Sequence, residues 1–150
     1  MRGLLVALMI TMATMVGTAS AEQQYGTMEE AKAMSLKAAA YVREQGRDAA
    51  TKAFMSPGAP WHDRDLYVFV LNGKGVNLAH GISPALVGKD LSELQDVTGK
   101  YMVKEFLEVK TEGSVEYFWE NPKTKEIETK SSYIVRVDDD TLVGVGAYKR

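Results

Sequence analysis

Residues 116–134 read EYFWENPKTKEIETKSSYI, two strand-like stretches joined by a lysine-rich turn that contains proline. Aromatic and β-branched residues favour strands, so this segment predicts a β-hairpin. Such a hairpin can build a small anion pocket, with aromatic side chains as the apolar wall and Lys130 as the cation. The alternative is a strand pair whose rings pack in the core while Lys130 lies on the solvated face.

The register of this hairpin decides which side chains share a face, because successive residues of a strand point to opposite sides of the sheet. If the numbers of facing residues add up to an odd value, as with Tyr117 opposite Lys130, the rings and the cation converge. Ser132 then lies on the same face as Trp119. If the sum is even, Tyr133 joins the rings and Lys130 turns away. The sequence leaves both registers open, and a bulge, which the sequence does not reveal, would bring Lys130 and Tyr133 to the same face.

Helices are predicted in the N-terminal part of the chain. Thr27-Met28-Glu29-Glu30 matches a capping box, in which the threonine side chain and the glutamate satisfy free amides at the start of a helix. Apolar residues continue at spacings of three and four as far as Gln45, and residues 47–55 resume the pattern after Gly46. Residues 101–109 mark a further amphipathic helix.

Strands make up most of the rest of the chain. Five are predicted, at residues 65–71, 76–80, 114–120, 126–137 and 141–148. The first is an unbroken apolar run, which is typical of a central strand buried on both faces. The irregular segment 81–98 is longer than an ordinary connection, and long loops in compact domains often carry function. This order predicts an α+β fold with a five-stranded antiparallel sheet and helices on one side or end.

The N-terminus has the three-part form of a secretory signal peptide over residues 1–21. Arg2 precedes the apolar run 4–16, and Ala19-Ser20-Ala21 fits the small-residue cleavage rule. Because the run is shorter than the roughly twenty residues that span a bilayer, we expect cleavage rather than a retained anchor. The mature chain, residues 22–150, is predicted to be one periplasmic domain without a membrane span.

Composition and missing motifs exclude several functions. The formal charge is −2, and −3 once Arg2 is removed, which argues against nucleic-acid binding. The absence of cysteine excludes thiol catalysis, attached haem and cysteine-bound zinc. With no Gly-x-Ser-x-Gly, His-Glu-x-x-His or phosphate loop, we expect neither an enzyme nor a cofactor. Asp138-Asp139-Asp140 invites a calcium interpretation but lacks the rest of an EF-hand loop, so a solvated turn is favoured and no metal site is predicted.

Several motifs, taken in order, resemble the single Cache domains (type 2) of extracytoplasmic sensors. The matching segments are Leu66-Tyr67-Val68-Phe69-Val70-Leu71, Leu78-Ala79-His80, Pro84-Ala85-Leu86-Val87-Gly88-Lys89-Asp90-Leu91, Glu116-Tyr117-x-Trp119-x-Asn121-Pro122, Lys130-Ser131-Ser132-Tyr133 and Gly144-Val145-Gly146-Ala147-Tyr148-Lys149. The resemblance implies a PAS-like fold, in which a long N-terminal helix packs against a five-stranded antiparallel sheet that carries a small-molecule pocket.

The resemblance also implies a function. Better-known members of the family sense acetate, propionate, pyruvate or lactate, and most sit between two membrane spans of chemoreceptors or histidine kinases. This chain looks like a free-standing periplasmic member, since a cleavable signal precedes the domain and no second span follows it. We therefore expect a soluble module that binds a small organic anion and presents its ligand state to a membrane receptor or kinase. The alternative is an interaction module with a vestigial pocket that docks a receptor or redox partner.

The candidate ligand-binding residues lie in the predicted hairpin and in the other segments that resemble the Cache family. They are Tyr67, His80, Tyr117, Trp119, Lys130, Ser132 and Tyr133. In this hypothesis Lys130 provides the positive charge, and His80 and Tyr133 donate hydrogen bonds. Tyr117 and Trp119 exclude water, which strengthens those contacts.

Overall fold

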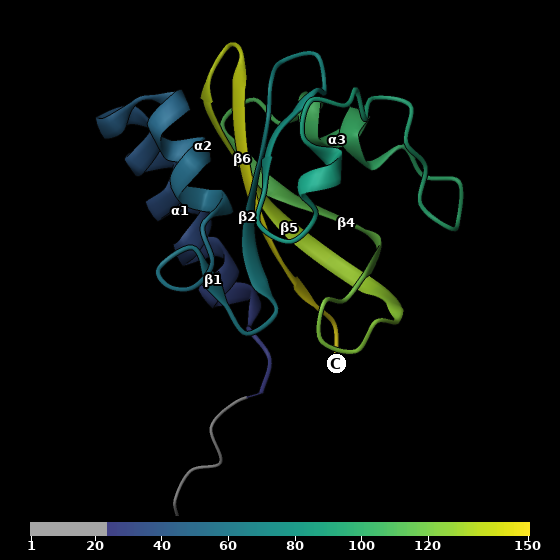
Figure 1. Ribbon diagram of the computed structural model, residues 1–150. Helices are drawn as coiled ribbons and strands as arrows, with labels where there is room; N and C mark the ends of the chain where they lie inside the picture. The colour runs from purple at the N-terminus through teal and green to yellow at the C-terminus, as the bar shows by residue number, and fades with distance from the viewer. Residues whose placement is uncertain (1–23) are drawn as a thin grey trace, which may run out of the picture.

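The computed structural model describes residues 24–150 of the chain (Figure 1). The predicted signal peptide, residues 1–21, lies outside the described residues. Within residues 24–150, no helix combines the length and the hydropathy that crossing a membrane requires.

The N-terminal helices begin and end where the sequence predicts. Helix α1, Met28–Gln45, starts at the capping box, in which Thr27 Oγ1 accepts from the Glu30 amide at 3.1 Å and Glu30 Oε2 accepts from the Thr27 amide at 2.8 Å. Gly46, with φ of 86°, adopts a left-handed backbone that glycine accommodates without strain, and it separates α1 from α2, Arg47–Met55. The long N-terminal helix is thus confirmed, followed by a shorter one.

All strands pair antiparallel. They are β1, His62–Asp63; β2, Leu66–Leu71; β3, Asn77–His80; β4, Glu112–Glu120; β5, Ile127–Asp138; and β6, Thr141–Tyr148. The order is β1-β2-β6-β5-β4, with β3 also paired to β2. The five predicted strands are confirmed within one or two residues at their ends. The sequence prediction missed β1, because two residues carry no periodicity that distinguishes a strand from a loop.

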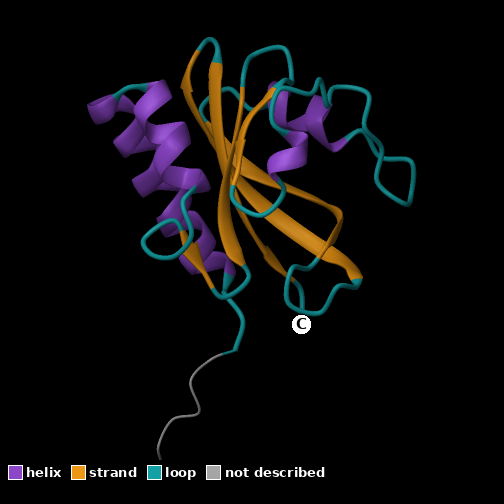
Figure 2. Cartoon of the chain, in the orientation of Figure 1, coloured by secondary structure: helices purple, strands orange, loops and turns teal. Residues whose placement is uncertain are grey.

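The sheet is covered on both faces (Figures 1 and 2). Helices α1 and α2 lie against one face, and α3, Met102–Glu108, lies on the other together with a short 3-10 turn at Pro84–Leu86. Residues of β2 alternate between the two sides: Val68 packs in the cluster beneath α1 and α2, whereas Phe69 packs with residues of α3. We call these the helix face and the pocket face of the sheet. An α+β fold with helices packed on an antiparallel sheet is confirmed.

Candidate ligand-binding pocket

The hairpin β4–β5 adopts the register that brings the aromatic rings and the cation together. Tyr117 pairs with Lys130 and Val115 pairs with Ser132, so the numbers of facing residues add up to an odd value. Tyr117, Trp119 and Lys130 consequently project into one cavity on the pocket face, whereas the even register would have turned Lys130 away.

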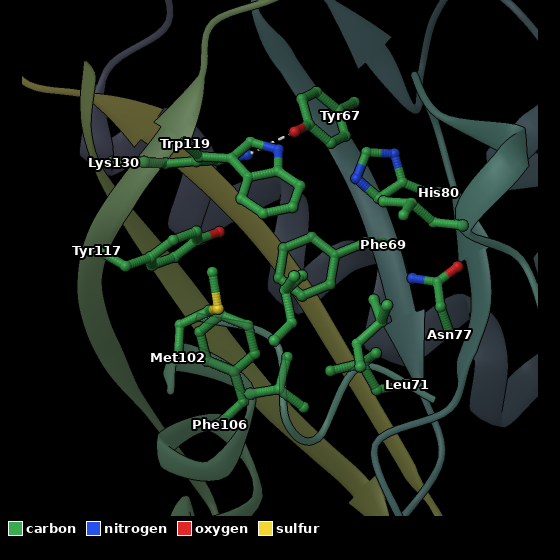
Figure 3. Close-up of a pocket in the computed structure, with 14 residues that line it drawn as sticks. Tyr67, Phe69, Leu71, Asn77, His80, Met102, Phe106, Tyr117, Trp119 and Lys130 are labelled. Atoms are coloured by element: carbon green, nitrogen blue, oxygen red, sulfur yellow. Dashed lines mark hydrogen bonds between the residues drawn. The ribbon is translucent and has the colours of Figure 1, made fainter. Parts of the chain in front are cut away.

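This cavity lies between the sheet and α3 (Figure 3). Its lining comes from the four strands β2, β3, β4 and β5, from α3, and from the 3-10 turn and the long loop before α3. The residues are Tyr67, Phe69, Leu71, Asn77, His80, Leu86, Leu91, Leu94, Met102, Val103, Phe106, Tyr117, Trp119 and Lys130. The cavity volume is about 30 Å³. A water molecule needs roughly 10–15 Å³ by the same measure, so the space suits only a very small molecule.

Lys130 is the cation of the pocket and is almost completely buried, with 1% of the residue exposed. Its Nζ donates to the Tyr67 hydroxyl at 2.8 Å and lies 4.0 Å from the centre of that ring. Burial disfavours the charged ammonium and lowers the pKa of Lys130 to about 7, although the negative charge of Asp65 opposes this shift. Lys130 is therefore poised between its charged and neutral forms near neutral pH.

The Asp65 carboxylate does not neutralise Lys130 directly, because other groups hold it. Its oxygens accept from the Gly26 amide at 2.7 Å and from Asn121 Nδ2 at 3.2 Å. Arg150 approaches it at 3.9 Å. Among residues 24–150, no carboxylate lies within ion-pair distance of Lys130. A buried cation without a direct counter-ion favours the binding of an anion beside it.

His80 supplies a neutral hydrogen-bond donor next to the cation. Its Nδ1 accepts from the Ser83 amide at 2.9 Å and from the Ile82 amide at 3.3 Å, so the proton of the neutral ring resides on Nε2. Burial, reinforced by the positive charge of Lys130, lowers the pKa of His80 to about 3. The imidazole is therefore neutral at physiological pH, and no described residue accepts a hydrogen bond from its Nε2–H.

Two tyrosine hydroxyls complete the polar part of the pocket. Burial raises the pKa values of both Tyr67 and Tyr117, so both hydroxyls keep their protons. Tyr117 Oη lies 2.9 Å from Ser132 Oγ. Ser132 thus contacts Tyr117 but is not among the residues that line the cavity. Trp119 packs against Tyr117 in an edge-to-face arrangement, with ring centres 6.2 Å apart, and closes the apolar wall.

The comparisons with known proteins agree with this architecture. The family model of the single Cache domain 2 matches residues 5–150. The chain belongs to the single Cache domain 2 family. Cache domains are sensory, non-catalytic modules of receptors. The Cache domain itself lies outside the cytoplasm.

Solved Cache structures share the fold. A methyl-accepting chemotaxis protein from Vibrio parahaemolyticus RIMD 2210633 is 23% identical with a TM-score of 0.69, over 80% of this chain and 86% of that chain. The periplasmic sensor domain of a chemotaxis protein is 26% identical with a TM-score of 0.64, over 81% of this chain and 90% of that one. A Cache chemosensory domain studied for carboxylic acid recognition is 22% identical with a TM-score of 0.63, over 81% and 88%.

Tyr133 does not reach the pocket of this Cache domain. It follows Ser132 in a regular strand and so lies on the helix face, where it packs with Ala39. Its carbonyl oxygen accepts from Ser35 Oγ of α1 at 2.8 Å, and Lys32 Nζ lies 5.0 Å from its ring centre. The predicted hydrogen bond from Tyr133 to a ligand is therefore not available, because it required the even register or a bulge, and β4 pairs with β5 in the odd register without interruption.

Asn77 is a pocket residue that the sequence reasoning missed. It is 1% exposed, lines the cavity, and its Oδ1 has no hydrogen-bond partner. Asn77 pairs with Leu71 and His80 pairs with Phe69, with an irregularity between them, so both share the pocket face although they are three residues apart. The available signal was a polar residue inside an apolar strand, which does not reveal the face it occupies.

Acidic residues elsewhere have structural roles. Asp140, in the turn between β5 and β6, accepts from the Gly73 amide at 3.0 Å and forms an ion pair with Arg47 at 3.0 Å. The turn prediction for this acidic run is thus confirmed. Across residues 24–150, no group of three or more His, Asp or Glu side chains is placed to hold a metal ion.

Proposed function

We propose that this Cache domain is a periplasmic binding module that captures a short-chain carboxylate and presents its bound state to a membrane receptor or kinase. The observation that carries the proposal is the Lys130 ammonium, which is buried in an aromatic cavity with no carboxylate of residues 24–150 in ion-pair contact. A bound carboxylate supplies the missing charge and forms a charge-assisted hydrogen bond with Nζ.

The distribution of side chains in the cavity fits such a ligand. Lys130, Tyr67 and His80 gather at one end, whereas Leu71 and Phe106 lie toward the other (Figure 3). An acid with a short carbon chain matches this division, with its carboxylate toward Lys130 and its chain toward α3. The small cavity volume favours acids of two or three carbons over longer ones.

A structural relative gives further support. The Cache chemosensory domain studied for carboxylic acid recognition has the same fold as this chain. That likeness alone carries no ligand assignment, since the identity is 22%. The buried cation and its neighbouring donors provide the independent argument from this chain's own residues.

Strand β6 offers a path from the pocket to a partner. Lys130 pairs across the sheet with Tyr148, whose ring centre lies 5.2 Å from Nζ. The Tyr148 hydroxyl donates to the Glu120 carbonyl at 2.6 Å. A ligand that draws the Lys130 ammonium toward the cavity changes the contacts at this end of β6, where a partner can detect the change.

The test is a binding measurement with matched charged and uncharged ligands. Isothermal titration of the purified protein with acetate, propionate, pyruvate and lactate should show binding of at least one acid, and propionamide should not bind. Thermal unfolding provides a second readout, because a ligand at a hundredfold excess over its Kd adds about 2.7 kcal/mol to the free energy of unfolding.

A pair of lysine variants controls for charge. Lys130→Met should abolish acid binding, whereas Lys149→Met should leave it unchanged, because Lys149 is exposed and pairs with Glu116 on the surface. Failure of every acid to bind, or equal binding of propionate and propionamide, would contradict the proposal.

A further inference from the structure

Asn77 presents a side-chain amide to the cavity that nothing in the described chain satisfies. The residue is 1% exposed and its Oδ1 has no hydrogen-bond partner. Buried polar groups are rarely left in this state, because an unpaired amide loses its hydrogen bonds to water without replacement. A polar group inside the cavity would supply the hydrogen-bond partner that the amide lacks.

The Asn77 side chain has no role in holding the local backbone. The connection to the following loop is made by main-chain groups: the Asn77 amide donates to the Lys89 carbonyl at 2.9 Å, and the Asn77 carbonyl accepts from the Gly88 amide at 2.7 Å. A purely structural account therefore leaves the side-chain amide unexplained.

The position of Asn77 separates it from the charged end of the pocket. Along β2, Tyr67 contacts Lys130, Phe69 pairs with His80, and Leu71 pairs with Asn77. Two residues along a strand span roughly 7 Å, so Asn77 lies one such step beyond His80, away from Lys130. Figure 3 shows this arrangement, with Asn77 beside Leu71 and apart from Lys130. Asn77 is therefore suited to a different part of the ligand than the carboxylate.

We propose that Asn77 recognises a hydroxyl or keto oxygen on the carbon chain of the ligand, so that the pocket prefers oxygenated short-chain acids to unsubstituted ones. This inference rests on the proposed function, since it assumes that Lys130 holds the carboxylate. An amide both donates and accepts, so either orientation of the Asn77 side chain can pair with a hydroxyl, and its nitrogen can pair with a keto oxygen. A methyl or methylene group pairs with neither and leaves the buried amide unsatisfied.

The test compares four three-carbon acids of similar size: propionate, lactate, 3-hydroxypropionate and pyruvate. Titration of the wild-type protein should show at least one oxygenated acid binding about tenfold or more tightly than propionate, because a site built around a hydrogen bond discriminates against the analogue that lacks the group. Equal or tighter binding of propionate would overturn the inference and leave the proposed function intact. Failure of all four acids to bind would overturn both.

The variant Asn77→Leu keeps the approximate shape of the side chain and removes the amide. It should lose the preference for the oxygenated acid, measured as the ratio of the Kd of propionate to the Kd of that acid, and the ligand-free protein should unfold at the same or a higher temperature. A preference that persists in this variant would overturn the assignment to Asn77. If Asn77→Leu does not fold, Asn77→Ala serves the same comparison, and the wild-type measurement stands without either variant.

Discussion

The two faces of the sheet are built from the same strands but differ in how their buried polar groups are paired. On the helix face, Val68 and Val145 pack with Phe54 of α2 in an apolar cluster, and the buried Ser35 hydroxyl is paired with the Tyr133 carbonyl. On the pocket face, Lys130 and Asn77 are equally buried, but among residues 24–150 no carboxylate forms an ion pair with Lys130 and no group donates to Asn77 Oδ1. We infer that the helix face stabilises the fold, whereas the pocket face keeps unpaired polar groups for a ligand.

Truncation of a buried ring on the helix face should cause the greatest loss of stability. Phe54 is fully buried and packs edge-to-face on Trp61, with ring centres 4.9 Å apart. Phe54→Ala should lower the free energy of unfolding by about 3–5 kcal/mol, because truncating a buried ring removes its burial and leaves a cavity. Chemical denaturation measures this loss, and titration below the unfolding transition should give an unchanged acid affinity.

Phe106→Ala is the matched truncation on the pocket face. Phe106 is 3% exposed and lines the cavity, so its loss enlarges the space that receives the carbon chain. We expect this variant to bind four- or five-carbon acids better than the wild type does. A larger loss of ligand affinity from Phe54→Ala than from Phe106→Ala would contradict the division between the two faces.

A second prediction concerns the pH dependence that Lys130 brings to the pocket face. Its pKa is about 7 in the folded protein, against an ordinary value of 10.5. Between these two values the unfolded chain holds a proton that the folded protein has released, so the free energy of unfolding rises with pH across that window. Below pH 7 both states are protonated and Lys130 adds no slope.

The variant Lys130→Met isolates this contribution. Denaturation of both proteins between pH 6 and 10 should show the extra rise in the wild type only, by up to a few kcal/mol. Acid affinity should fall in the wild type as pH rises above 7, because the neutral amine no longer balances a carboxylate. Parallel stability curves for the two proteins would show that Lys130 is charged as an ordinary surface lysine is.

Removal of a single tyrosine hydroxyl, on one face or the other, should have a smaller effect on acid affinity. Tyr67→Phe takes away the hydrogen-bond partner of Lys130 and should weaken acid binding by about 1 kcal/mol, or roughly fivefold. Tyr133→Phe should leave the affinity unchanged, since Tyr133 lies on the helix face. Titration of the two variants tests the register directly, and a loss from Tyr133→Phe equal to that from Tyr67→Phe would contradict it.

Much of the fold could be predicted because its signals are local. The capping box at Thr27, the unbroken apolar run of β2 and the turn residues each act within a few positions of the chain. Strand β1 escaped prediction because two residues have no measurable period. The candidate site was harder to predict, because its members come from elements far apart in sequence: Tyr67 and Lys130 are 63 residues apart and share a hydrogen bond.

The sequence by itself determined the type and order of the longer helices and strands and singled out Lys130 among the aromatic residues of the hairpin. Only the tertiary structure decided which side chains share the pocket. The register of β4 and β5 turned Lys130 inward and Tyr133 toward α1, and an irregularity in β3 brought Asn77 onto the face of His80. The physical reason is the two-residue period of a strand, since a shift of one position exchanges the faces of every side chain, and pairing and packing across the whole sheet select the register.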